Sequence, residues 1–144
     1  MIDISRRASF WILLTIVSIG AYFRLHGIAL WELTVDEYFL GKSIISVAEN
    51  GLPNFPDGGY YLRGILQQFL TAPFYLATEN IELSVRIIPA FSNIIAIPGV
   101  FLIGSLLLNK RAGLLAAALF SLSLWEIEFA RFGRMYAPFQ ALFI

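Results

Sequence analysis

Two adjacent carboxylates, Asp36 and Glu37, are the side chains in this sequence best placed to do chemistry. They follow the first long apolar run of a 144-residue chain that is 58% hydrophobic and only 14% charged. Because charge is scarce, its placement is informative. A carboxylate in such a position can act as a general base, taking a proton from a hydroxyl or amine as that group attacks.

Three arginines further along the chain complement these acids. Arg86 stands near the start of the second long apolar run, and Arg131 and Arg134 follow the third at a spacing that puts both on one helix face. A guanidinium can bind a phosphate through two parallel hydrogen bonds and stabilise the charge on a departing phosphate. The set therefore favours a lipid-phosphate-linked substrate, whose head group lies at a membrane interface and whose tail needs an apolar groove.

Four of these five residues also have a purely structural interpretation. The pattern Thr34-x-x-Glu37 is a capping box that starts a helix, and Asp36 is an acid favoured near a helix N-terminus by the helix dipole. Arg131 and Arg134 can anchor a helix at the membrane interface beside neighbouring acids. Spacing alone leaves both interpretations open.

Composition narrows the classes of function. The chain has 10 basic and 10 acidic residues, which argues against a nucleic-acid partner that would require a basic excess. It has no cysteine, so neither disulfides nor thiolate metal ligands are available. The single His26 has no evident partner for metal binding. No metal site is assigned, and no cofactor is certain, although a divalent metal is left open.

The elements that must position these side chains are membrane helices, because the apolar runs are long enough to cross a bilayer. We expect an all-α fold with a single membrane domain over residues 1–144. Arg24 lies in the far third of the first run, where it either reaches the interface or faces another helix. The predicted spans lie at about 8–31, 84–108 and 112–130, with the start of a fourth at 136–144.

Two features of the predicted spans concern their packing. Prolines at positions 89 and 98 predict kinks in the second span. Small residues in the third span, beginning with Gly113, permit close contact with a neighbouring helix.

The stretch from 32 to 83 between the first two spans has seven acidic residues and only two basic ones. Basic residues instead stand before the first span, at Arg6 and Arg7, and between the second and third spans, at Lys110 and Arg111. The positive-inside rule then predicts an integral membrane protein with a cytoplasmic N-terminus and an exoplasmic 32–83 loop.

Two juxtamembrane amphipathic helices are expected within this loop. The capping box starts the first at about Val35, and the signal Asn50-Gly51-Leu52-Pro53 ends it after Glu49. A turn-rich connection follows over 54–59. The second helix covers about 64–78, which is too short and too polar for a confident span.

Five segments in a fixed order carry a resemblance to a known family. They are YFRLHGI, WELTVDEYFLGKSI, NGLPNFPDGGYYLRG, ELSVRIIPAFS and ARFGRMYAP, and together they extend over nearly the whole chain. This order resembles the N-terminal portion of the polyprenyl-phosphate-dependent type C membrane glycosyltransferases, which include protein O-mannosyltransferases and the aminoarabinose transferase of lipid A. Members of that family are several times longer.

The resemblance implies a glycosyltransferase that moves a sugar from a polyprenyl-phosphate carrier to an exoplasmic acceptor, with inversion at the anomeric carbon. Asp36 matches the first-loop aspartate that serves as the catalytic base or its close equivalent. Glu37 matches the acid beside it, which is sometimes near a metal or the acceptor. Arg86, Arg131 and Arg134 are similar in position to arginines that surround the donor phosphate or structure the outer cavity.

Two other classes of function are compatible with the sequence. A non-catalytic membrane subunit would pack its unfinished fourth helix against a larger complex, or against a missing C-terminal part, and use the acidic loop for contact with protein or membrane lipid. The hypothesis of a transporter fragment has less support. The charged residues cluster at the outer boundary of the membrane, whereas transport sites usually lie at its midplane.

Overall fold

The computed structural model describes residues 5–55 and 57–144, and within these ranges the named elements are all helices. An isolated antiparallel bridge joins Asn54 to Tyr60. The predicted all-α fold is therefore confirmed. The helices are α1 (Arg6–Leu25), α2 (Val35–Asn50), α3 (Ile65–Thr78), α4 (Ile81–Leu107), α5 (Lys110–Leu122), α6 (Leu124–Arg131) and α7 (Tyr136–Phe143).

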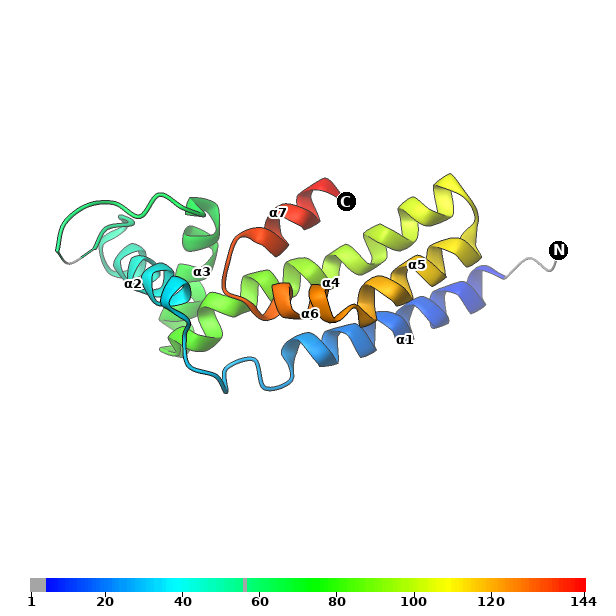
Figure 1. The fold of residues 1–144 in the computed structure, drawn as a ribbon, viewed down its shortest axis with the longest axis horizontal. Helices are drawn as coiled ribbons and strands as arrows, with labels where there is room; N and C mark the ends of the chain where they lie inside the picture. The colour runs from blue at the N-terminus through cyan, green and yellow to red at the C-terminus, as the bar shows by residue number, and fades with distance from the viewer. Residues whose placement is uncertain (1–4, 56) are drawn as a thin grey trace.

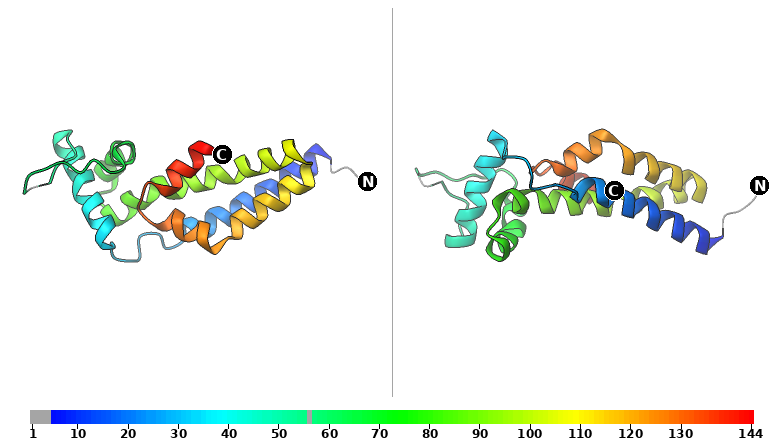
Figure 2. Two further views of the ribbon diagram at one scale, coloured as in Figure 1. Left: turned by 45° about the horizontal axis from the view of Figure 1, so that its top comes forward. Right: turned by 90° about the horizontal axis from the view of Figure 1, so that it is seen from below.

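Helices α1, α4 and α5 lie side by side and form an elongated bundle (Figure 1). Helices α2 and α3 lie at the end of this bundle that is farther from the N-terminus, and the turned views in Figure 2 show the same arrangement. Helix α6 continues from α5 toward that end, and α7 packs back against α4. The acidic loop thus forms a separate head on the bundle.

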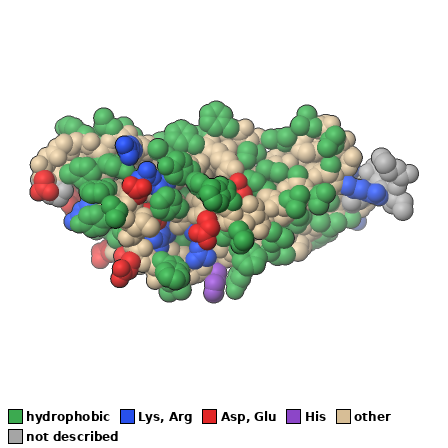
Figure 3. Space-filling model, in the orientation of Figure 1, with side chains coloured by type: hydrophobic (Ala, Val, Ile, Leu, Met, Phe, Trp, Pro, Cys, Tyr) green, Lys and Arg blue, Asp and Glu red, His purple; other side chains and the backbone are tan. Residues whose placement is uncertain are grey.

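The bundle has the helices of an integral membrane protein. Helices α1 and α4 are each long and apolar enough to cross a membrane, and α5 with α6 gives a third span if the bent pair crosses as one. Large apolar side chains such as Trp11, Leu106 and Leu119 are exposed on the bundle surface, whereas small ones such as Ala90 and Ala117 are buried. Figure 3 shows hydrophobic side chains along the bundle and most of the charged ones toward the α2–α3 end.

The first helix ends earlier than the sequence predicts. Helix α1 stops at Leu25 rather than near position 31, because His26 adopts an extended backbone conformation and Gly27 has a φ of 64°. The following linker, residues 26–34, therefore leaves the bundle as irregular chain. Its backbone carbonyls become available to bind side chains from other helices.

The third span is not the continuous helix predicted for 112–130. It breaks at Ser123, and α5 and α6 meet at an angle of 57°. The Ser123 side chain accepts a hydrogen bond from the Glu126 backbone N–H at 3.4 Å, so it caps the second half. The motif Ser123-x-x-Glu126 is a helix-start signal, although it lies inside an apolar run long enough to predict one continuous span.

Arg24 faces other helices. It donates hydrogen bonds to backbone carbonyls near the end of α5, where the break leaves them without their usual helical partners. Its guanidinium is fully buried and donates to the carbonyls of Ser121 at 2.9 Å and Phe120 at 3.3 Å. It also donates to Asn93 Oδ1 of α4 at 2.6 Å. A broken helix inside a membrane requires such partners, because lipid offers none. Arg24 thereby fastens α1 to α4 and α5.

Helices occur at both places predicted within residues 32–83, and their position beside a membrane stays a prediction. Helix α2 starts at Val35, with both hydrogen bonds of the capping box present between Thr34 and Glu37, and ends at Gly51 in the left-handed conformation. Helix α3 matches the expected 64–78 segment within a residue. The predicted turn at 54–59 includes Pro56, which lies outside the described residues.

Helices α4 and α5 approach each other through glycines. A Cβ placed on Gly104 would lie 2.8 Å from the Cα of Gly113, so the two backbones are in direct contact. This confirms the expected role of the small residues in the third span. Pro89 and Pro98 lie inside α4, which is assigned as a single helix from end to end.

Replacement of Gly104 by Ala should destabilise the bundle by about 1–3 kcal/mol, because the added methyl group overpacks the α4–α5 contact. Thermal unfolding in detergent measures this loss. Leu106→Phe adds bulk on the exposed face of the same helix and should leave the Tm nearly unchanged. Equal Tm values for Gly104→Ala and the wild type would contradict the packing described here.

Candidate functional site

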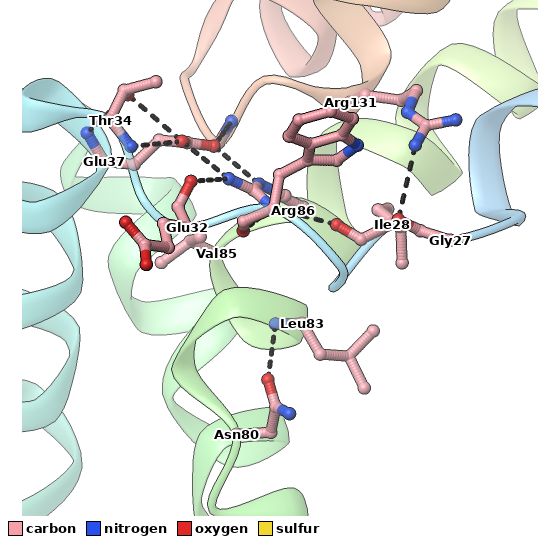
Figure 4. Close-up of polar contacts among 12 residues, drawn as sticks. Gly27, Ile28, Glu32, Thr34, Glu37, Asn80, Leu83, Val85, Arg86 and Arg131 are labelled. Atoms are coloured by element: carbon pink, nitrogen blue, oxygen red, sulfur yellow. Dashed lines mark hydrogen bonds and ion pairs between the residues drawn. The ribbon is translucent and has the colours of Figure 1, made fainter.

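The centre of the head is a buried ion pair between Glu37 of α2 and Arg86 of α4. Arg86 Nε lies 2.8 Å from Glu37 Oε1, and Arg86 Nη2 lies 2.9 Å from Oε2, so the contact is bidentate. The Glu37 side chain is 1% exposed and the Arg86 side chain 5%. Figure 4 shows the two facing each other between α2 and α4. Such geometry is the strongest that a guanidinium and a carboxylate can form.

Backbone groups complete the environment of the Glu37 carboxylate. Its Oε2 accepts from the Thr34 backbone N–H at 3.0 Å and from the Thr34 hydroxyl at 3.1 Å, and its Oε1 accepts from the Gly133 N–H at 2.7 Å. Burial by itself raises the pKa of Glu37. The hydrogen bonds from Arg86, Thr34 and Gly133, with the charge of Arg86, outweigh it and lower the pKa below its ordinary value.

Arg86 uses its remaining N–H groups on the linker after α1. Nη1 donates to the carbonyls of Ile28 at 3.0 Å and Trp31 at 2.8 Å, and Nη2 donates to that of Glu32 at 3.0 Å. With the two bonds to Glu37, all five N–H groups of the guanidinium are engaged. In this arrangement Arg86 has no N–H group left to donate to a phosphate. Its contacts instead hold the linker and α2 against α4.

A cavity of about 450 Å³ opens beside this pair. Arg131 of α6 lies on its wall and donates to the carbonyls of Phe23 at 3.1 Å and Gly27 at 3.3 Å, which ties α6 to the end of α1 (Figure 4). The cavity is lined by Ile28, Trp31, Glu32, Thr34, Glu37, Arg86, Glu128, Arg131 and Phe132.

Asp36 lies outside that cavity and pairs with Arg134 instead. Its Oδ1 lies 3.1 Å from Arg134 Nη1, and the side chains are 56% and 10% exposed respectively. The contact is an ion pair without aligned hydrogen-bond geometry, since Nη1 has no hydrogen-bond partner among the described residues. The Arg134 guanidinium also stands 5.8 Å from the centre of the Tyr136 ring. An accessible carboxylate thus adjoins a largely buried cation.

The five residues singled out in the sequence therefore fall into two groups. Glu37, Arg86 and Arg131 surround the cavity, and Asp36 and Arg134 form a second pair. The groups are connected through the backbone, because Glu37 accepts from the N–H of the residue that precedes Arg134. Catalysis by Asp36 or Glu37 and phosphate binding by the arginines stay predictions.

Sequence reasoning missed the backbone partners of this site. The Gly133 N–H and the linker carbonyls bound by Arg86 carry no residue-type signal, so no pattern could have indicated them. Gln67 of α3 was also missed, although a glutamine in an apolar helix was a visible signal. It is 3% exposed and its Oε1 has no hydrogen-bond partner among the described residues.

Across residues 5–55 and 57–144, no group of three or more His, Asp or Glu side chains is placed to hold a metal ion. No protein-family model, curated protein or solved structure matches the chain. The fold itself defines the class, which is an all-helical membrane protein with a polar site at one end of its bundle.

Replacement of Glu37 by Gln should destabilise the protein by about 3–5 kcal/mol, because it leaves the buried Arg86 charge without its carboxylate. Unfolding monitored by circular dichroism in detergent measures the change. Glu49→Gln, at the exposed far end of the same helix, is the matched control and should behave as the wild type. A Glu37→Gln protein as stable as this control would show that the pair does not hold the head together.

The lowered pKa of Glu37 predicts acid sensitivity of the fold. Folding favours the ionised form, so its contribution is complete above about pH 5 and is lost as the pH falls through the unfolded value of about 4.3 toward the lower folded pKa. The Tm difference between wild type and Glu37→Gln should therefore shrink as pH is lowered. A difference that stays constant between about pH 3 and pH 7 would refute this link.

Proposed function

We propose that this chain belongs to a membrane glycosyltransferase that transfers a sugar from a polyprenyl-phosphate carrier to an acceptor on the exoplasmic side. The observation that carries the proposal is the pair of Asp36 and Arg134, in which a half-exposed carboxylate adjoins a largely buried guanidinium. A transfer of this kind requires one base and one cation close together, at the end of a membrane bundle where a lipid head group can reach both.

The proposed reaction is a single displacement. The acceptor hydroxyl attacks the anomeric carbon while its proton passes to the Asp36 carboxylate. The bond from that carbon to the phosphate oxygen breaks, and the polyprenyl phosphate leaves with the electron pair and its negative charge. The Arg134 guanidinium stabilises this charge through hydrogen bonds to the phosphate oxygens. The anomeric configuration inverts because attack and departure occur on opposite faces.

The other candidate residues are assigned positioning roles. Glu37 and Arg86 fix the first turn of α2, which carries Asp36, and Glu37 also holds the Gly133 N–H beside Arg134. Each Nη atom of Arg131 donates one hydrogen bond to a backbone carbonyl. Its side chain also lines the cavity, where its remaining N–H groups can donate to a ligand. We therefore give the donor phosphate to Arg134 and leave Arg131 as a secondary contact.

Charge placement supports an exoplasmic site. Lys110 and Arg111 begin α5, and Arg6 and Arg7 begin α1. Both helix starts lie at the bundle end opposite α2 and α3 (Figure 1). The positive-inside rule would place that basic end in the cytoplasm. The head with Asp36 would then face outward.

Asp36→Asn should lower sugar transfer by about 10²–10⁴-fold, because a carboxamide cannot take the acceptor proton. The assay follows transfer from a labelled polyprenyl-phosphate sugar by the complete protein, with its expression and its donor binding measured in parallel. Glu49→Gln, a neutralised acid on the same helix, should retain activity.

Wild-type turnover by Asp36→Asn would remove the base assignment. A complete wild-type protein that binds no donor and transfers no sugar would favour the non-catalytic subunit instead.

A further inference from the structure

A small cavity lies between α6 and α7, and it shares no lining residue with the cavity beside Glu37. Its volume is about 190 Å³, below the range of about 300–1,000 Å³ that is usual for ligand pockets. It therefore suits one small group of a ligand rather than a whole molecule. We call it the aromatic pocket. Its lining residues are Trp125, Glu126 and Phe129 of α6 and Tyr136 and Gln140 of α7.

The three aromatic residues of this pocket stand in a row. The ring centres of Trp125 and Phe129 are 5.1 Å apart, and those of Phe129 and Tyr136 are 5.6 Å apart. An aromatic ring attracts a cation over its face, and the indole of tryptophan does so most strongly. Arg134 already stands 5.8 Å from the centre of the Tyr136 ring. The rings that remain for a ligand are therefore those of Phe129 and of Trp125, which is 71% exposed.

The aromatic pocket also contains a carboxylate with unused capacity to accept hydrogen bonds. The half-buried Glu126 accepts from Gln140 Nε2 at 3.0 Å through Oε1, and from Asn93 Nδ2 at 2.9 Å through Oε2. A carboxylate can accept about four hydrogen bonds, so about two of its acceptor positions stay open. Within the described part of the chain, the ion pairs of Lys and Arg do not involve Glu126.

The buried charge of Arg24 acts on Glu126 without pairing with it. The guanidinium instead donates to Asn93 Oδ1 and to backbone carbonyls, among them those of Phe120 and Ser121. These two carbonyls lie in the last turn of α5, where the helix dipole places partial negative charge beside the cation. Amide groups therefore hold the Glu126 carboxylate in place and leave it available to a second cation.

A primary ammonium group fits this combination of a carboxylate and aromatic rings. Its three N–H donors can reach the open acceptor positions of Glu126 and Gln140 Oε1, while its charge lies against the Trp125 ring. Gln140 Oε1 already accepts from Asn93 Nδ2 at 3.3 Å and has a second lone pair. A quaternary ammonium has no N–H donor for these acceptors. A phosphate or carboxylate would be repelled by Glu126.

The surroundings of the pocket indicate a lipid as the carrier of this ammonium group. Leu124, next to Trp125, is 80% exposed, and α6 belongs to the bent pair that gives a third span. Arg131 donates to the carbonyls of Phe23 and Gly27, which places α6 beside the end of α1 (Figure 1). The end of a spanning helix lies near the head groups of the bilayer, where tryptophan and tyrosine are enriched.

We propose that the aromatic pocket binds the primary ammonium group of an aminophospholipid such as phosphatidylethanolamine, held between the Glu126 carboxylate and the Trp125 ring. Because the pocket walls come from α6 and α7, the bound head group would join these two helices. The inference does not rest on sugar transfer, since neither Asp36 nor Arg134 lines the pocket.

The test is native mass spectrometry of the complete protein in a nonionic detergent, titrated with phospholipids that share the same acyl chains. Phosphatidylethanolamine should bind about fivefold or more tightly than phosphatidylcholine, because the methylated head group has no N–H to donate to Glu126. It should exceed phosphatidylglycerol by about fivefold or more as well, because that lipid has no ammonium group.

Three variants at exposed tryptophans sharpen the test. Trp125→Ala removes a ring that is 71% exposed, so the fold should persist while binding of phosphatidylethanolamine weakens about three- to tenfold. Trp125→Phe keeps an aromatic ring and should restore most of the binding. Trp11→Ala removes an exposed tryptophan of α1 outside the pocket, and this matched control should bind as the wild type.

Replacement of Glu126 by Gln tests the carboxylate. The side chain keeps its size and loses its charge, so phosphatidylethanolamine and phosphatidylcholine should then bind equally. Because Glu126 also joins α6 to Asn93 and Gln140, the Tm is measured alongside. If this variant does not fold, the comparison of Trp125→Ala with Trp125→Phe and Trp11→Ala decides the proposal.

Equal binding of the three phospholipids by the wild type would overturn the proposal, as would a Trp125→Ala protein that keeps the full preference for phosphatidylethanolamine. Soluble ethanolamine that displaces the lipid at equal concentration would overturn the assignment to a lipid. None of these measurements follows sugar transfer. A protein that binds the lipid as expected and transfers no sugar would retain this site and reject the proposed enzyme.

Discussion

The buried pair of Glu37 and Arg86 is the interaction on which the polar head of this molecule depends. Removing both charges from water is expensive, and the cost is offset only because every polar atom of the pair finds a partner. These partners come from α2, α4, the linker after α1 and the segment before α7. Four parts of the chain, three of them far apart in the sequence, are thereby held in one arrangement by one ion pair.

A second buried arginine, Arg24, joins helices within the bundle as Arg86 does in the head. Arg24 supplies hydrogen bonds to carbonyls exposed where α5 and α6 separate, and it links α1 to Asn93 of α4. Charge is scarce in this chain. Both of these buried arginines donate hydrogen bonds to backbone carbonyls and thereby join helices to one another. An intramembrane arginine is often taken as a sign of function. Here its contacts give a sufficient structural reason for its presence.

The two neighbouring acids illustrate how position divides structural from chemical roles. The Glu37 side chain is buried and accepts two hydrogen bonds from Arg86, two from Thr34 and one from Gly133. These contacts lower its pKa and so favour its ionised form. Asp36, one residue earlier, points away from that pair and stays more than half exposed beside Arg134. A group that must exchange protons with a substrate needs access, whereas a group that fixes a scaffold needs burial. Asp36, the proposed base, therefore has the access that Glu37 lacks.

The sequence alone was enough to predict the helical class, the bounds of α2 and α3 to within a residue, and the presence in the third span of small residues that permit close helix packing. These features depend on local patterns, namely a capping box, a terminating glycine, apolar length and small residues. Tertiary structure decided the pairing of Glu37 with Arg86 and the partners of Arg24. The reason is physical: the partners are mostly backbone groups and side chains far away in the sequence, and a backbone N–H or carbonyl looks the same at every position until the fold brings it to a charge.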